Sequence, residues 1–498
     1  MADTLSTELI EFIFAYAAEI DATTAANVCL TNRRGRKIAT PILYRTICIA
    51  AFGKNRVNET PVTTWCILVR RMQRLCQSLW KKPNLARYVK RIVHDADFGM
   101  PHFHAEIYNP TFDKEVRDKI LALRPPIRPE IEIAMGMPGN ASDTQDLLTV
   151  FLLIICPNLE SLSIEGLPRS RWEHRKTLDD FFFNSNSIVE TVRRDNPYNG
   201  ATMFRTDGVQ NVREISLSCT GREELSASIA ANMMRYIHRL LPSLRVVEIG
   251  LLHRETNGLH TGWQASVSPI EELRIMSCGW DMSGNTPRLD DLVWMVPALR
   301  SLSISFNKNV NVYDSSTFDW GAIIGAFQQF AGLETLRLDY LYLGLASSAK
   351  CHRALKEHSA CRPITDLKFF PRLKALSVPA FALFGCRIND QGQHVPRVDT
   401  YYQLQYLLPW TLTELEVVCD NEHFTDDDMD MLRMVGPEWL DDVIIVNCFR
   451  EKWISRRHGE GSVGERAVRR NKTAYLDAFF NPLMTRQHHF HLDCRLGE

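Results

Sequence analysis

The stretch Leu299–Ile304 reads LRSLSI, in which an apolar residue is followed by two more, Leu302 and Ile304, at intervals of three and two. Successive side chains of a β-strand point to opposite faces, so Leu302 and Ile304 would share one face while the serines take the other. Apolar residues on one face and polar residues on the other indicate a half-buried strand. The stretch therefore predicts a short strand with one side in a core.

The same phrase, apolar-x-x-apolar-x-apolar, recurs on both sides of this stretch. The middle residues of successive phrases lie between 26 and 53 positions apart. A partial phrase, Val89 and Ile92, extends the series toward the N-terminus. The other complete phrases are Leu159/Leu162/Ile164, Val212/Ile215/Leu217, Leu244/Val247/Ile249, Ile270/Leu273/Ile275, Leu333/Leu336/Leu338, Leu373/Leu376/Val378 and Leu412/Leu415/Val417. Eight phrases in order predict a stacked array of strands.

The phrase resembles the LxxLxL core of leucine-rich repeats. One such unit cannot close its own core, so neighbouring units stack and their strands form a parallel sheet. Helical patterns such as GAIIGAFQQFAG (residues 321–332) would return the chain on the other side. We therefore expect an α/β fold: an irregular leucine-rich-repeat-like solenoid with parallel strands on its concave side and helices on its convex side.

The first fifty residues carry a different pattern. Leu5, Leu9, Ile13 and Tyr16 recur at helical spacing, which predicts an amphipathic helix. A second helix is expected from about Asp21 and a turn at residues 32–35, with a third helix running toward Pro41. Three short helices bury little core alone, so their apolar residues predict docking, either onto the following domain as an N-terminal cap or onto a partner protein.

This segment resembles an F-box, in particular that of fungal F-box/leucine-rich-repeat proteins. The matching stretches are LSTELIEFIF (Leu5–Phe14), NVCLTNRRGRKIA (Asn27–Ala39) and PILYRTI (Pro41–Ile47). The family usually has Pro where Ser6 stands and Leu where Ala17 stands. The resemblance implies docking to a Skp-type adaptor, and through it to a cullin, by Leu5, Leu9, Ile10, Ile13, Val28, Pro41, Leu43 and Tyr44.

These patterns divide the chain into four parts. We expect an F-box-like module at residues 1–50 and a helical linker or N-terminal cap of the array at 51–95. The solenoid would occupy residues 96–420, and a C-terminal cap with a basic tail residues 421–498.

Composition limits the partners and the compartment. The 58 basic and 59 acidic side chains nearly cancel, so no global attraction to nucleic acid or membrane is expected. Residues 1–97 hold 15 Lys and Arg against 8 Asp and Glu, an excess that fits an RNA or phosphate surface or, more simply, solvated helix faces. The 13 cysteines form no CxxC pair, which favours reduced thiols in the cytoplasm or nucleus. The longest apolar run, residues 147–156, is too short to span a bilayer.

No nucleotide-binding, metal-binding or hydrolase motif is present in the sequence. We assign no catalytic residue, cofactor or metal, and no residues for the protein substrate. The leading hypothesis is a non-catalytic substrate-recognition subunit of an SCF-type ubiquitin ligase that binds an unidentified target protein. A repeat scaffold unrelated to ubiquitin is the alternative, followed by an enzyme with its site in the insertions at residues 165–211 or 380–410.

Overall fold

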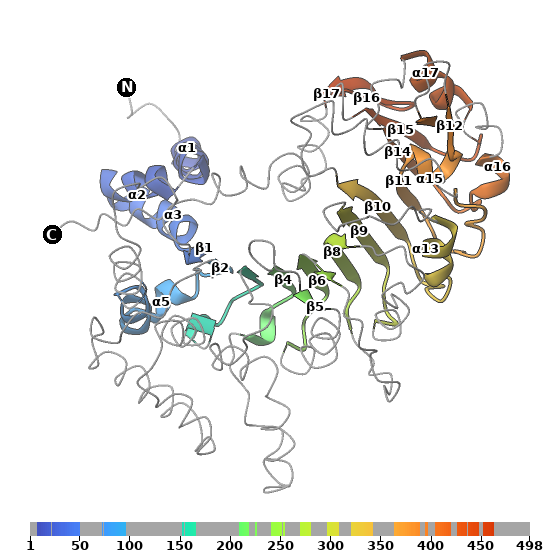
Figure 1. The fold of residues 1–498 in the computed structure, drawn as a ribbon. Coiled ribbons are helices and arrows are strands. Elements are labelled where there is room, and N and C mark those ends of the chain that lie inside the picture. The colour runs from blue at the N-terminus through green and yellow to red at the C-terminus, as the bar shows by residue number, and fades with distance from the viewer. Residues whose placement is uncertain are drawn as a thin grey trace, which may run out of the picture. The chain divides into compact units, whose positions relative to one another are not determined.

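The computed structural model describes residues 7–20, 22–49, 72, 74–95, 152–153, 155–165, 209–218, 225–226, 241–250, 252–253, 269–279, 296–307, 320–341, 363–388, 394–396, 404–419, 426–435, 437–447 and 452–462 (Figure 1). These residues fall into two compact units. Unit 1 holds the described residues up to Arg245 except Ser226, and unit 2 holds Ser226 and those from Val246 onward.

Unit 1 begins with three helices, α1 (Thr7–Ile20), α2 (Ala22–Thr31) and α3 (Arg33–Leu43). They enclose a small core of Ala25, Val28 and Ala39, against which Phe14, Ala17, Cys29, Ile42 and Leu43 pack. The expected turn at residues 32–35 is wrong. Asn32 alone joins α2 to α3, and its side chain caps α3 by accepting a 2.7 Å hydrogen bond from the Gly35 N–H.

Gly35 is required where α2 and α3 meet. A Cβ atom at this position would lie 2.5 Å from the Val28 carbonyl oxygen and 2.6 Å from Thr31 Oγ1. Both atoms are held by α2, so only a residue without a side chain lets the helices approach this closely.

The strands of unit 1 form the parallel run β1 (Thr46–Ile49), β2 (Arg91–Asp95), β3 (Ser161–Glu165) and β4 (Glu214–Ser218). The buried residues Ile47, Ile92, Leu162 and Ile215 align across the run. A short helix α5 (Pro83–Ala86) precedes β2, and a 3-10 turn, η4 (Val209–Asn211), precedes β4. Each strand thus places one apolar residue at the same level of a common core.

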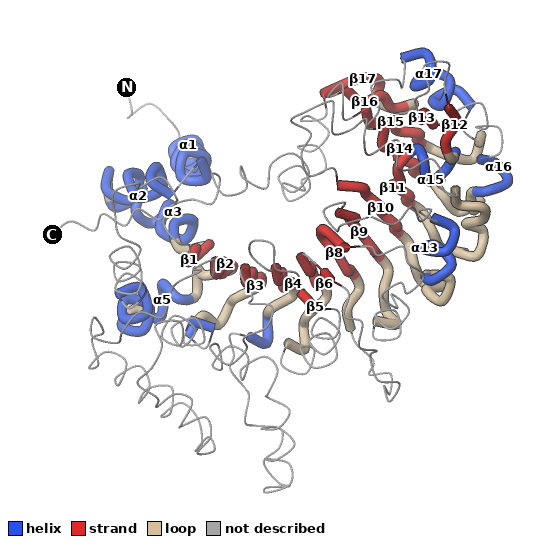
Figure 2. The backbone as a smooth tube through the Cα atoms, in the orientation of Figure 1, coloured by secondary structure: helices blue, strands red, loops and turns tan. Residues whose placement is uncertain are grey.

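Unit 2 continues the pattern with β6 (Val246–Gly250), β8 (Glu272–Gly279), β9 (Ser301–Asn307), β10 (Thr335–Leu341), β11 (Ala375–Pro379), β14 (Glu414–Cys419) and β15 (Asp442–Asn447), all parallel (Figure 2). Seven buried middle residues align from strand to strand: Val247, Leu273, Leu302, Leu336, Leu376, Leu415 and Val443. The same register therefore holds although the intervening segments differ in length.

A turn precedes most of these strands. In eight of them the N–H of the first apolar residue donates to the carbonyl oxygen three residues earlier, at 3.0–3.4 Å: Val89, Leu159, Leu244, Leu299, Leu333, Leu373, Leu412 and Leu440. The residue that accepts the bond is itself buried, as with Cys156, Phe330 and Phe370. The repeating unit is thus a turn with a buried first residue followed by a strand.

An antiparallel hairpin, β16 (Lys452–Ser455) and β17 (Gly459–Ser462), ends the run of unit 2 beside β15. Its turn is held by Ser455, whose Oγ donates to Asp442 Oδ1 (2.8 Å) and accepts from the His458 N–H (2.9 Å). Gly459 supplies the positive φ of 75° that this turn needs.

The remaining elements are β5 (Leu225–Ser226), β7 (Leu252–His253), α13 (Trp320–Ala326), α15 (Ala380–Phe384), β12 (Cys386–Ile388), β13 (His394–Pro396), α16 (Leu404–Leu407) and α17 (Asp426–Val435).

The opposite face of the unit 2 strands is mixed. It carries a buried apolar cluster of Val418, Ile444, Val446 and Trp453 and, beside it in the sheet, an almost fully buried polar group. Arg337 Nη2 on β10 lies 3.1 Å from Glu416 Oε1 on β14, and Ser377 on β11, the strand between them, donates to the same oxygen at 2.9 Å. Three neighbouring strands are therefore joined by charge-assisted hydrogen bonds as well as by their backbones.

The expected α/β class is confirmed: among the described residues, thirteen of the seventeen strands pair in mostly parallel, open runs. Every predicted phrase forms a strand at the predicted place, and the weaker Val89/Ile92 match forms β2. The phrases Tyr44/Ile47/Ile49 and Leu440/Val443/Ile445 were missed, so strands also lie inside the expected F-box-like module and beyond residue 420.

Candidate docking surface on the first three helices

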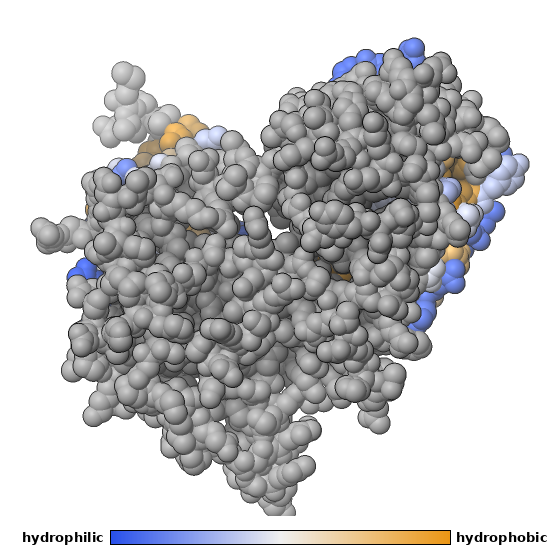
Figure 3. Space-filling model, in the orientation of Figure 1, coloured by the Kyte–Doolittle hydropathy of each residue, from blue (hydrophilic) through white to orange (hydrophobic). Residues whose placement is uncertain are grey.

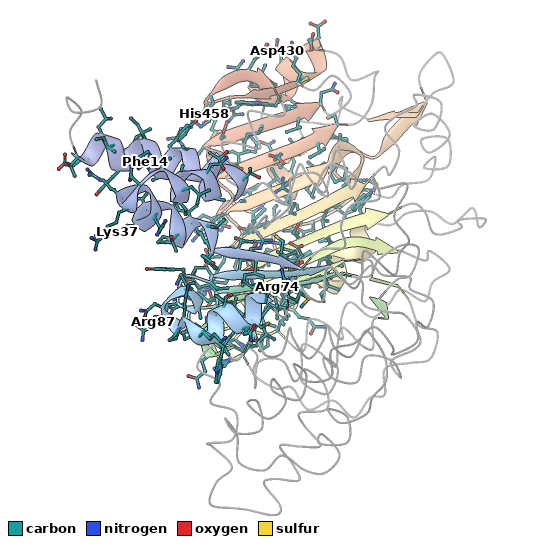
Figure 4. The ribbon with its side chains drawn as sticks, turned by 90° about the vertical axis from the view of Figure 1, so that its left-hand side faces the viewer. Phe14, Lys37, Arg74, Arg87, Asp430 and His458 are labelled. Atoms are coloured by element: carbon teal, nitrogen blue, oxygen red, sulfur yellow. The ribbon has the colours of Figure 1, made fainter. Side chains whose placement is uncertain are left out.

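Helix α1 has an inner apolar side. Ile10, Phe14 and Ala17 recur at spacings of four and three and are partly buried, and Phe14 and Ala17 pack on the core of the three helices. Figure 4 places Phe14 among these helices. This spacing keeps the three side chains on one side of the helix, so the inner side accounts for the folding of α1 within unit 1.

A second apolar stripe lies on another side of α1. Leu9, Phe12, Ile13 and Tyr16 follow the spacing i, i+3, i+4, i+7, and their exposed fractions are 44%, 68%, 46% and 67%. We call these four residues the α1 stripe. Figure 3 shows the hydrophobic colour over this helix. A helix that is apolar on two sides is typical of one buried on both, yet here one side is open.

The starts of α1 and α3 and the end of α2 meet at one end of the helical group. Arg34 on α3 donates to the Thr7 carbonyl and pairs with Glu11 Oε1 at 3.2 Å. Leu30, the last but one residue of α2, is 77% exposed there. Figure 4 shows Lys37 on the outer side of α3. Arg34 thus links the starts of α1 and α3 at this end.

The residues predicted to contact an adaptor divide into three groups. Leu9 and Ile13 are exposed on the α1 stripe, whereas Ile10, Pro41, Leu43 and Tyr44 are half-buried. Val28 is buried in the core, so its side chain holds the helices together rather than facing outward. Leu5 lies outside the described residues.

Three exposed apolar residues were absent from the predicted contact set: Phe12, Tyr16 and Leu30. The signal that could have found the first two is the helical period itself. Once Ile10, Phe14 and Ala17 are assigned to the inner side, Phe12 and Tyr16 must lie with Leu9 and Ile13. Leu30 depends on the tight joint at Asn32, which the sequence pattern did not reveal.

The chemistry of this surface is that of binding. It offers aliphatic and aromatic side chains with a few cations, and it is suited to burial against an apolar groove. Within the described part of the chain, no three His, Cys, Asp or Glu residues gather as metal ligands would. None of the described helices combines the length and the apolar character that a bilayer crossing requires.

No protein-family model matches the chain, and no curated protein sequence matches it.

Proposed function

We propose that this protein is the substrate-recognition subunit of an SCF-type ubiquitin ligase. In this proposal the first three helices act as an F-box that docks a Skp-type adaptor, which binds a cullin in turn. The strand array is a leucine-rich-repeat-like solenoid that holds a target protein, and the chain itself carries no catalytic step. Such a subunit works in the cytoplasm or nucleus.

The single observation that carries the proposal is the open α1 stripe. Its four large apolar side chains remain exposed although Phe14 and Ala17 of the same helix already pack on the core of the three helices. Contiguous exposed apolar residues on a small helical module mark protein-interaction sites. The spacing of Leu9, Phe12, Ile13 and Tyr16 is the one used when a helix lies in the apolar groove of a partner.

The strand array supports the second half of the proposal. Parallel strands in constant register, most of them entered through a turn, are the expected consequence of an LxxLxL repeat.

The test is direct binding of the full chain to a recombinant Skp-type adaptor, measured by calorimetry. We expect Leu9→Asp and Ile13→Asp each to weaken the complex by at least about 30-fold, since a desolvated charge would enter an apolar contact. Circular dichroism and the unfolding midpoint of both variants should match the parent, because neither side chain belongs to the core.

Thr23→Asp is the matched control, since it adds the same charge at an exposed position of α2 outside the stripe. It should bind as the parent does. Absence of adaptor binding by the unsubstituted chain at micromolar concentration would refute the proposal. A repeat scaffold unrelated to ubiquitin, in which the helices only cap the array, predicts instead that Leu9→Asp and Ile13→Asp lower the unfolding midpoint.

A further inference from the structure

Three large aromatic side chains are exposed where the last two parallel strands of unit 2 begin. Trp410 lies in the turn before β14, Trp439 lies in the turn before β15, and Tyr406 belongs to the short helix α16 just ahead of the first turn. Their exposed fractions are 81%, 40% and 67%. Figure 1 shows α16 on the outer side of these strands. We call the three residues the aromatic patch.

The two turns that carry the indole rings lie side by side. Strands β14 and β15 pair in register from Glu414 and Asp442 onward. In each turn the N–H of the first apolar residue of the phrase donates to the carbonyl oxygen three residues earlier, at 3.1 and 3.0 Å. Trp410 therefore stands beside Glu438, about 4.8 Å away along the sheet, and Trp439 is one residue further on. One bound segment could contact both rings.

The backbone that presents these rings is fixed. Pro409 and Pro437, which begin the two turns, are buried. Arg456, which follows β16, donates from Nη1 to the carbonyl oxygens of Leu440 at 3.0 Å and of Pro437 at 3.4 Å. A surface held in place before binding loses little conformational entropy when a partner arrives.

The strands and turns around the patch are acidic. Residues 404–419 and 437–447 contain five carboxylates and neither Lys nor Arg. Glu416 and Asp442 are buried and hydrogen-bonded within unit 2. Glu438 and Asp441 are exposed on either side of Trp439 in the sequence, and neither forms an ion pair with another described residue. The patch thus combines open aromatic faces with exposed negative charge.

The cations next to the patch act elsewhere. Arg372 and Lys374, at the start of the neighbouring strand β11, both lower the pKa of Glu334, Lys374 chiefly through its hydrogen bond. Arg456 is engaged with carbonyl oxygens of the second turn. The described part of unit 2 therefore leaves the charges of Glu438 and Asp441 to an outside partner.

We infer that the aromatic patch binds an Arg- and Lys-rich segment of a partner protein. Cations are attracted to the faces of aromatic rings, most strongly to Trp, and the neighbouring carboxylates accept charge-assisted hydrogen bonds. A wholly apolar partner would cover Glu438 and Asp441 without supplying a counter-charge, which is costly. The inference names the kind of segment that the array would hold and in that respect rests on the proposed function, but the binding itself requires no adaptor.

The test is binding of a fluorescein-labelled octaarginine peptide to the full chain, followed by fluorescence anisotropy. We expect binding that weakens as salt is raised, and a Kd about tenfold higher in Trp410→Ala/Trp439→Ala, from two lost cation–π contacts. Trp410→Ala alone should raise the Kd about threefold and leave the unfolding midpoint unchanged, because this side chain is 81% exposed. Glu438→Gln/Asp441→Asn should also raise the Kd about threefold and reduce its salt dependence.

Each kind of substitution has a matched control. Phe12→Ala/Tyr16→Ala removes two exposed rings from the α1 stripe, and Asp427→Asn/Asp430→Asn removes two exposed carboxylates from α17, where Figure 4 labels Asp430. Both control variants should bind octaarginine as the parent does.

Losses in the control variants equal to those in the patch variants would overturn the inference, since they would show a response to net charge or to exposed rings in general. Binding of a neutral proline-rich peptide but not of octaarginine would overturn it as well. A chain that binds octaarginine through the patch but binds no adaptor would support the inference and refute only the proposed function. Adaptor binding without octaarginine binding would refute the inference alone.

Discussion

Gly35 shows how one residue sets the geometry of the proposed docking module. We expect Gly35→Ala to lower the stability of the three helices by about 1–3 kcal/mol, since the added methyl group overlaps backbone and side-chain atoms of α2. Loss of protection in the amide hydrogen exchange of α2 and α3 would measure the effect.

Gly325→Ala provides the control. This glycine also lies in a helix, α13, but a Cβ atom there would meet nothing within 4 Å. Alanine is the better helix former by about 0.8–1.0 kcal/mol, so the control should be neutral or stabilising. If both substitutions destabilised the protein equally, the close packing of α2 against Gly35 would not be the cause of the stability lost in Gly35→Ala.

The pKa of Glu334 reports on its ion pair with Lys374 in unit 2. Its carboxylate accepts a hydrogen bond from Lys374, which is the main reason that its pKa lies below the ordinary value of 4.5. A lowered folded-state pKa contributes stability above the ordinary pKa, and this contribution is lost as the pH falls through the lowered value. We expect Lys374→Gln to return the pKa of Glu334 toward 4.5, as followed by NMR titration.

Arg300→Gln should change the pKa of Glu334 less than Lys374→Gln does, because Arg300 lies 4.0 Å from the Glu334 carboxylate whereas Lys374 lies 2.8 Å from it. An equal or larger shift from Arg300→Gln would contradict the assignment of the Lys374 hydrogen bond as the main cause.

At the scale of single elements, the aligned middle residues are the main source of strand stability. Leu336, the second residue of β10, is fully buried between Leu302 and Leu376 on the neighbouring strands. We expect Leu336→Ala to lower the free energy of unfolding by about 2–5 kcal/mol, through lost burial and the cavity left behind. Chemical denaturation monitored by circular dichroism would measure the change.

Thr335→Ala is the neighbouring control on the same strand. Thr335 is half-buried and alternates with Leu336, so its side chain points to the other face. Its loss should change stability by less than about 1 kcal/mol. Similar effects of both substitutions would show that the alternation of faces does not govern β10.

The strands were predictable from the sequence because their phrase is local. Period-two alternation preceded by an apolar residue three positions earlier predicts both the strand and its inward face. β15 was missed although its phrase, Leu440/Val443/Ile445, fits, since two aspartates lie inside it. One of them, Asp442, is buried and stabilised by Ser455, which is a contact made only after the β16 strand folds back.

The proposed docking surface was predictable only in part. Helical spacing placed Leu9 and Ile13 correctly on an apolar side, but it could not separate the inner side of α1 from the outer side. That separation depends on where α2 and α3 pack. Val28 was therefore assigned to the surface, although its side chain forms the core of the helical group.

At the scale of the whole chain, nearly equal numbers of acidic and basic residues conceal an uneven distribution. Residues 1–97, for example, hold 15 Lys and Arg against 8 Asp and Glu. Net charge describes non-specific attraction by the complete molecule, whereas recognition depends on charges that the fold brings together.

Strand register is independent of the length of the segments between strands. Middle residues 26 positions apart, Val247 and Leu273, align as well as Leu336 and Leu376, which are 40 apart. Most strands are positioned by their own turn and buried residues, so the alignment does not depend on the number of residues between them. Such a framework allows loops of new sequence to be grafted one at a time, and specificity for a target can be changed without redesigning the core.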